Sequence, residues 1–191
     1  MKITSLRLFV RIPRERLGVL IGSEGKIKQY IENKLDVELQ IESSSGGVAI
    51  TQKQKSVDPS TLFTAKDIIS AIGRGFAPNQ AFRLIRNADE IFDFVDLRLI
   101  FGHSDSDIRR VKSRVIGSNG KTRRLIEELT ETSLVIYGHT IGIIGTFTQL
   151  EIARNAIQMI INGSQHTTVY KFLQRKRNDL KKQKLNLWKE L

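Results

Sequence analysis

Two short glycine-rich strings are the parts of the chain best suited to binding a ligand. They read Gly22-Ser23-Glu24-Gly25-Lys26 and Gly117-Ser118-Asn119-Gly120-Lys121, and aliphatic residues precede both. Glycine allows positive φ and lets a ligand approach the main-chain N–H groups closely. A helix that begins after such a turn adds the positive end of its dipole and unpaired N–H donors. We call residues 22–25 the first turn and 117–120 the second turn, and both are predicted to bind phosphate.

The sequence around the two turns repeats as well. The turns lie 95 positions apart (117 minus 22) in a chain of 191 residues, and a repeat of that length predicts two domains. Each half has the pattern of a strand, a helix, the turn, a second helix, two short strands and a last helix. We place the first domain at 1–88, the second at 89–164 and a basic C-terminal helix at 165–191.

Alternating apolar residues predict the strands, and apolar residues at helical spacing predict the helices. In the first half we expect strands at 4–12, 37–41 and 48–51, and helices at 14–21, 27–35 and 58–73. In the second half we expect a first strand within 92–101, short strands near 134–136 and 142–144, and helices at 106–116, 121–129 and 149–161. The C-terminal helix is expected to dock by its first turns and to fray by its last.

Composition points to a polyanionic partner. The chain has 31 Lys and Arg against 20 Asp and Glu, a net charge of +11, and such a field attracts nucleic acid, although membrane surfaces also attract basic proteins. No apolar run of about 18 residues exists, so we expect no membrane span. Arg7 and Arg11 interrupt what would be the apolar part of a signal peptide, and with no cysteine the chain is expected to be cytoplasmic.

Enzymatic alternatives find little support. The string Gly120-Lys121-Thr122 suggests a nucleotide triphosphatase, but that motif needs a glycine where Val115 stands and a strand before the turn. The three histidines are far apart in the chain, and without cysteine they make a weak metal site. No Ser/His/Asp set can be singled out. We therefore expect no catalytic residue, no cofactor and no metal.

The two turns differ in charge. Glu24 lies inside the first turn, where a carboxylate repels phosphate, whereas the second turn is uncharged and has basic flanks. We expect the second turn to be the stronger phosphate site, although its arginines could also be a solvated helix face. The candidate nucleic-acid-binding residues are Gly117, Ser118, Asn119, Gly120, Lys121, Arg123, Arg124 and Arg114 in the second copy, and Gly22, Ser23, Gly25, Lys26 and Lys28 in the first.

A helix-turn-helix over a small antiparallel sheet, with G-x-x-G at the turn, resembles the KH domain. The resemblance implies an α+β fold of two tandem type I KH domains, each a small antiparallel sheet packed on helices, plus the C-terminal helix. It also implies that each turn binds the backbone of four nucleotides while the bases lie along an apolar groove. By position, the grooves would be lined by Leu20, Ile21, Ile27, Leu39 and Ile41, and by Val115, Ile116, Thr122, Leu134 and Ile136, although most of these aliphatic residues could simply be core.

The linker between the two repeats and the C-terminal tail indicate which KH proteins the chain resembles. Gly73-Arg74-Gly75-Phe76, Ala81-Phe82-Arg83-Leu84 and the tail Tyr170-Lys171-Phe172-Leu173-Gln174-Arg175-Lys176-Arg177 are similar to archaeal small-subunit ribosome-assembly KH proteins of the "partner of Nob" type. That likeness implies a non-enzymatic factor that binds single-stranded RNA at the 3′ end of small-subunit rRNA (16S type) and assists its maturation. It further implies a Nob-type endonuclease and translation initiation factor two alpha as partners.

Two other functions remain open on the sequence. The same modules could form a general or messenger-RNA-binding regulator, or a scaffold whose KH folds bind proteins. Residues 168–177 interleave aromatic rings with cations, which suits RNA because rings stack on bases, but a protein-docking helix would use the same residues.

Overall fold

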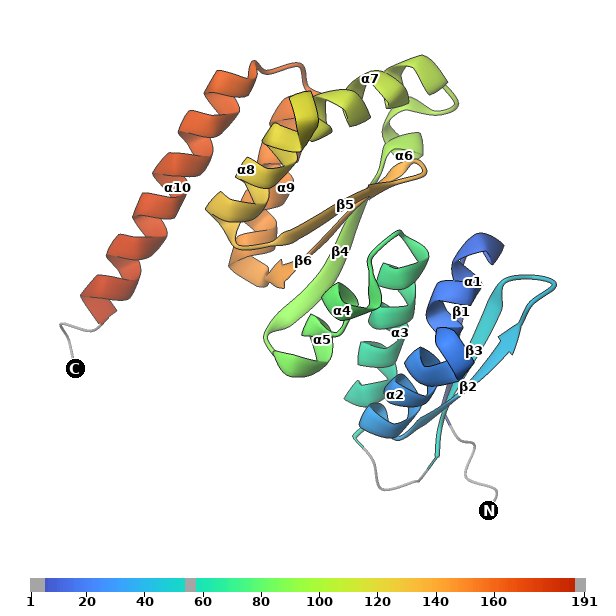
Figure 1. Ribbon diagram of the computed structural model, residues 1–191. Coiled ribbons are helices and arrows are strands. Elements are labelled where there is room, and N and C mark those ends of the chain that lie inside the picture. The colour runs from blue at the N-terminus through green and yellow to red at the C-terminus, as the bar shows by residue number, and fades with distance from the viewer. Residues whose placement is uncertain (1–5, 54–57, 188–191) are drawn as a thin grey trace. The chain divides into compact units, whose positions relative to one another are not determined.

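The computed structural model describes residues 6–53 and 58–187, and it consists of two compact units (Figure 1). The first unit is Met1–Phe92 and the second is Asp93–Leu191. The division falls four residues (92 minus 88) after the boundary that we placed from the sequence. Each unit contains a three-stranded sheet covered by helices, which confirms the predicted α+β class.

The first unit follows the predicted order of elements. It contains β1 (Arg7–Arg11), α1 (Arg14–Ile21), α2 (Lys26–Leu35), β2 (Val37–Glu42), β3 (Gly47–Gln52), α3 (Ser60–Gly73), α4 (Pro78–Ala81) and α5 (Arg83–Arg86). Strand β3 is central and antiparallel to both neighbours, with Val48 opposite Val10 and Ile41. Burial alternates along β1 and along most of β2, because one face of the sheet packs on the helices and the other faces water.

The second unit has the same architecture with one added segment. Its first strand is β4 (Glu90–Asp96), of which three residues (90–92) precede the division between the units. The other elements are α6 (Leu97–Phe101), α7 (Asp105–Ile116), α8 (Lys121–Thr130), β5 (Ser133–Tyr137), β6 (Thr140–Thr146), α9 (Phe147–Ile161) and α10 (His166–Leu187). The strand order is β4-β6-β5, and β5 and β6 are antiparallel. One apolar core joins β4 to β6 with α7 to α10.

The first strand of this unit begins at Glu90, two residues (92 minus 90) before the predicted range of 92–101, and it ends at Asp96. The chain turns there into helix α6, because the Asp96 carboxylate accepts a hydrogen bond from the Arg98 amide at 2.9 Å and Leu97 is fully buried. The path from the end of the first strand to the glycine turn is therefore 21 residues (117 minus 96) in this unit and 11 (22 minus 11) in the other. We call residues 97–106, the ten additional residues, the insertion.

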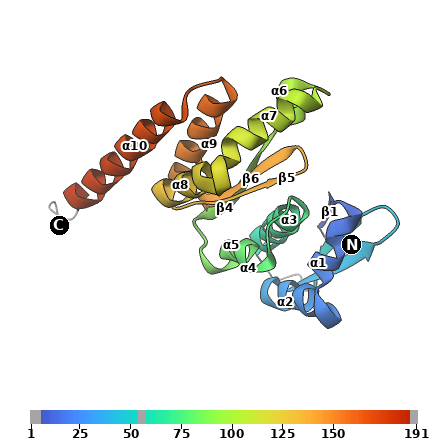
Figure 2. The ribbon, with the colours of Figure 1, turned by 45° about the horizontal axis from the view of Figure 1, so that its top comes forward.

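Helix α10 docks by its first turns, as predicted. Val169 and Leu173 are fully buried against α8 and α9, and Leu180 is partly buried (Figures 1 and 2). The helix continues to Leu187, and the fraying that we predicted for its last turns falls partly on residues 188–191, outside the described residues. Within the described part of the chain, no helix is both long and apolar enough to cross a membrane.

Candidate nucleic-acid interface

The two turns have the same backbone conformation. The leading glycines have φ/ψ of 73°/175° at Gly22 and 71°/176° at Gly117, and the closing glycines have φ of 75° at Gly25 and 74° at Gly120. A Cβ on Gly117 would collide with the side chain of Thr122, so this position needs glycine for space as well as for φ. The turn geometry predicted from the repeat is thus present in both units.

The residue before the closing glycine is left-handed in both turns. Its φ is 55° at Glu24 and 51° at Asn119. Asparagine adopts this conformation more readily than most residues because its short side chain can hydrogen-bond locally. The second turn therefore has the better residue for the backbone as well as the uncharged one.

The lysines that follow the turns differ in their surroundings. The Lys26 ammonium lies 2.8 Å from the carboxylate of Glu24, inside the first turn. Lys28 is paired in turn with Glu32, at 3.7 Å. Lys121 is exposed and forms no ion pair with any residue in the described ranges 6–53 and 58–187. A phosphate at the first turn would compete with Glu24, whereas one at the second would find the lysine free.

Two arginines of α8 lie beside the second turn. The Arg124 guanidinium donates to the carbonyl oxygen of Asn119 at 2.8 Å, so it both fixes the turn and adds positive charge to it. Arg123 lies 3.7 Å from Glu127 one helical turn further on, and both arginines are exposed. With Lys121, these side chains make the predicted basic cluster at the start of α8.

Arg114 has a structural role that our prediction of RNA binding did not include. Its guanidinium donates to the carbonyl oxygen of Ile160, in the last turn of α9, at 2.8 Å and to that of Ser164, three residues beyond the helix, at 2.5 Å. The last carbonyls of a helix have no partner within the helix, and a charged donor satisfies them well. Arg114 is half-buried and committed to this cap, which argues against a direct phosphate contact.

Helix α10 hydrogen-bonds both helices that flank the second turn. The Tyr170 hydroxyl hydrogen-bonds the Thr122 hydroxyl at 2.8 Å, and Nε2 of His166 lies 2.8 Å from the carbonyl oxygen of Arg114. These contacts join α10 to the helix on each side of the turn. Sequence reasoning missed them because 48 and 52 residues separate the partners.

The predicted grooves are only partly accessible. Half of the residues assigned to them are buried, whereas the alternative interpretation placed most of the aliphatic ones in the core: Leu20, Leu39, Val115, Thr122 and Leu134. The remaining aliphatic residues are at least partly exposed beside the turns: Ile21, Ile27 and Ile41 in the first unit, and Ile116 and Ile136 in the second. These leave room for base contacts only along a narrow apolar strip. Among the described residues, no group of three or more His, Asp or Glu side chains could hold a metal ion.

Comparisons with known proteins identify the family. Residues 91–178 match the family model for the second KH domain of PNO1, a eukaryotic-type (type I) KH domain. A KH domain-containing protein of Methanocaldococcus jannaschii is 41% identical over 181 residues, which are 95% of this chain and 78% of the relative. The pre-rRNA-processing protein pno1 of Schizosaccharomyces pombe is 27% identical over 161 residues, 84% of this chain and 67% of the relative.

A solved structure extends the likeness to the whole fold. The crystal structure of a complex of a/eIF2alpha, aDim2p and rRNA from Pyrococcus horikoshii contains a similar chain, with a TM-score of 0.86 and 39% identity over 93% of this chain and 97% of that one. These matches confirm the KH fold and the resemblance drawn from the linker and the tail. The chain belongs to the PNO1 (Dim2p) family of KH-domain proteins.

Proposed function

We propose that this protein is a non-enzymatic factor of small-subunit rRNA maturation that binds single-stranded RNA at the 3′ end of the rRNA. One observation carries the proposal: the second turn is free of acid and has an exposed Lys121 beside it that pairs with no described residue, with Arg124 hydrogen-bonded to the turn itself. Family membership favours a ribosomal precursor as the RNA that is bound, because relatives are named pre-rRNA-processing proteins.

The second turn acts by capturing the RNA backbone. A phosphate meets the N-terminal end of α8, where the helix dipole and unpaired N–H groups favour a negative charge. Lys121 and Arg124 add charge at the same point, and bases pack along the strip that includes Ile116 and Ile136. Affinity should fall by about 0.7 log units per log unit of salt for each phosphate neutralised.

The first turn contributes a weaker contact. Its backbone is equivalent, but the Glu24–Lys26 pair must open before a phosphate can use the lysine. A second weak contact still raises the overall affinity if both turns reach one strand, because the second binding step is then intramolecular.

Two protein partners complete the proposal. The structural relative from Pyrococcus horikoshii is bound to a/eIF2alpha as well as to rRNA, which supports initiation factor two alpha as a partner of this chain. A Nob-type endonuclease, which would cut the precursor, is proposed from the sequence resemblance. In this assembly the protein positions RNA, and the cleavage chemistry belongs to the partner.

Binding to labelled RNAs tests the proposal directly. The probes are an RNA from the 3′ end of the small-subunit rRNA and a scrambled RNA of equal length and composition, and the readout is fluorescence anisotropy. We expect the rRNA probe to bind at least about tenfold more tightly, a difference of about 1.4 kcal/mol. Equal binding of both, with crosslinks in cells spread over messages, would favour the messenger-RNA regulator. No binding of either at low salt would favour the protein scaffold.

A further inference from the structure

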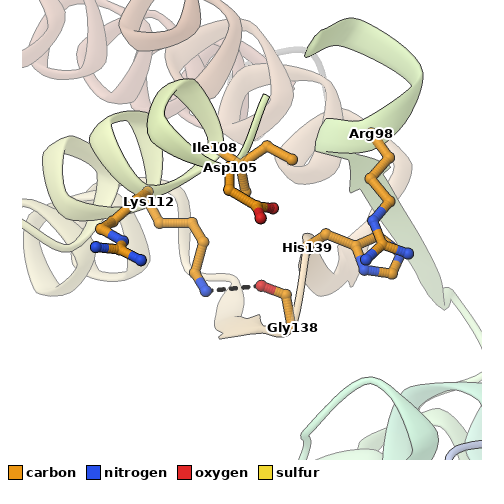
Figure 3. A pocket seen from close by; sticks show the side chains of 7 residues that line it. Arg98, Asp105, Ile108, Lys112, Gly138 and His139 are labelled. Atoms are coloured by element: carbon orange, nitrogen blue, oxygen red, sulfur yellow. Dashed lines mark hydrogen bonds between the residues drawn. The ribbon is translucent and has the colours of Figure 1, made fainter. Parts of the chain in front are cut away.

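The insertion builds a pocket that the repeat pattern does not predict. The pocket lies between α6, the N-terminal half of α7 and the turn that joins β5 to β6, and its volume is about 270 Å³ (Figure 3). Ile108 is its buried apolar residue, and Gly138 belongs to the strand turn. The polar lining consists of Arg98, Asp105, Arg109, Lys112 and His139.

Two of the three cations of the pocket are available to a ligand. Arg98 and Arg109 are exposed, and neither guanidinium hydrogen-bonds or pairs with another described side chain or carbonyl. Lys112 donates to the carbonyl oxygen of Gly138 at 2.7 Å and so holds the strand turn against α7 (Figure 3). The Nε2 atom of His139 is 3.6 Å from the Asp96 carboxylate. Three permanent positive charges thus surround one small space.

Asp105 decides what kind of ligand the lining suits. Its carboxylate points into the same space (Figure 3), where it would weaken the binding of a bare anion. A nucleotide matches the mixed lining better, because its phosphate and ring acceptors take hydrogen bonds from the cations and its base amino groups donate to a carboxylate. Guanidinium planes also stack on unpaired RNA bases.

The pocket lies along the same helix as the second turn. Arg109 precedes Gly117 by eight residues (117 minus 109), which is about 12 Å at a rise of about 1.5 Å per residue. A KH turn holds about four nucleotides, so a longer strand can continue past it. We propose that this pocket holds one nucleotide of the strand that the second turn binds, outside those four. This inference rests on the proposed function.

The first unit lacks most parts of this pocket, although Arg14 stands where Arg109 does. At the repeat offset of 95, Leu17 stands where Lys112 does, and it is almost fully buried. Ser44 stands where His139 does, and no segment corresponds to the insertion with Arg98. The pocket therefore adds a second reason for RNA to favour the second unit.

The test compares RNAs of two lengths on matched variants of the full chain. The probes are an RNA of about four nucleotides and RNAs extended by about four more at the 5′ or the 3′ end. We expect one of the extensions to tighten binding by about tenfold, and Arg109→Gln to abolish most of that gain while changing the affinity for the short RNA by less than about twofold. Arg110→Gln is the control, since it removes the same charge from the next residue, outside the pocket.

Each result separates the alternatives. An equal loss with Arg109→Gln and Arg110→Gln, at both lengths, would overturn the pocket and leave only general electrostatic attraction. Asp105→Ala should weaken the extended RNA by about threefold, and tighter binding would show a plain anion site instead. Wild-type protein that binds RNA with no length dependence refutes the pocket alone, whereas failure to bind any RNA refutes the proposed function with it.

Discussion

The first and second turns have the same backbone conformation but different electrostatic environments. Their glycines agree in φ within a few degrees, yet Lys26 pairs with Glu24 in one turn, whereas Lys121 beside the other has no ion-pair partner in the part of the chain that the structure describes. Backbone conformation thus defines where a phosphate fits, and the neighbouring side chains decide whether an anion is stabilised there. A matching G-x-x-G string alone does not make two sites equal.

In both units an arginine hydrogen-bonds the carbonyl oxygens at and just after the end of the last KH helix, but the arginine stands at different positions. Arg16 of α1 donates to the carbonyl oxygens of Ile72 and Phe76, at 2.8 and 2.7 Å. Arg114 of α7 donates to those of Ile160 and Ser164, and both pairs of carbonyls are 88 positions apart (160 minus 72 and 164 minus 76). At the offset of 95 that relates the two turns, Arg114 corresponds to position 19, which is three residues (19 minus 16), or about one helical turn, after Arg16. The helix end must be capped, but the position of the donor can shift by a turn.

The largest effect is expected from acid in the turns. Ser118→Asp with Asn119→Asp should weaken RNA binding by about 100-fold or more, because two carboxylates then face the phosphate. Ser23→Asp with Glu24→Asp should cost less than about threefold, since that turn already holds an acid and contributes little. Anisotropy titrations measure both, and thermal melting checks that each variant is folded. The reverse ranking would end the claim that the second turn dominates.

Loss of the helix-end caps comes next. Arg16→Gln and Arg114→Gln should each lower the free energy of unfolding by about 2 kcal/mol, because part-buried carbonyls lose a charged donor. Urea denaturation measures this loss. RNA affinity of Arg114→Gln, measured well below its melting temperature, should stay within about twofold of wild type. A large loss of affinity at unchanged stability would restore Arg114 as an RNA contact.

Removing the acid from the first turn should make the two turns more alike. Glu24→Asn frees Lys26 and places asparagine at the left-handed position, as in the second turn. We expect affinity for a long RNA to rise by about threefold to tenfold, with a salt slope steeper by about 0.7 as one more phosphate is neutralised. Glu38→Gln, which removes the same charge from an exposed site on β2, should change the slope little. An equal rise with Glu38→Gln would mean that net charge alone is responsible.

The support from α10 predicts a smaller change. Tyr170→Phe deletes only the hydroxyl bonded to Thr122 and should weaken RNA binding by about threefold, since a hydrogen bond of this kind contributes about 1 kcal/mol. Tyr30→Phe removes a hydroxyl from the first unit and serves as the control. In a double-mutant cycle with Thr122→Val, the second substitution should add almost nothing. Additive losses would show that the two hydroxyls act separately.

The smallest effect concerns a carboxyl of the first unit. Burial raises the pKa of Asp67 above its ordinary value of 3.8, although Lys66 opposes this. The folded state therefore holds this proton more tightly, so the group favours folding below pH 3.8 and loses that contribution as the pH rises through the raised pKa. Asn155 occupies the matching place in α9, at the offset of 88. Asp67→Asn should raise the melting temperature slightly at neutral pH and give no gain at acid pH, and a gain at both would exclude titration of Asp67 as its cause.

Sequence patterns among residues close together in the chain were enough to predict most of the helices and strands. Helix α1 has the bounds that we predicted, because Pro13 precedes it and Gly22 ends it. The range predicted for the first strand of the second unit extended into α6 because Val95-Asp96-Leu97-Arg98-Leu99 alternates like a strand. Burial of Leu97 and the Asp96 cap override that alternation. The pocket built by the insertion was therefore outside the reach of pattern analysis.

The sequence by itself determined the duplication, the two glycine turns and the basic charge, since turn conformation and helix periodicity depend on residues close together in the chain. Only the tertiary structure decided which cations are free at the turns. Arg114 is committed to carbonyls 46 and 50 residues away, and Tyr170 reaches the second turn across 48 residues. Contacts of that range depend on how helices pack, and packing brings together groups that no local spacing relates. This is why the chain alone could indicate a phosphate-binding turn but not which of its basic neighbours remain available to RNA.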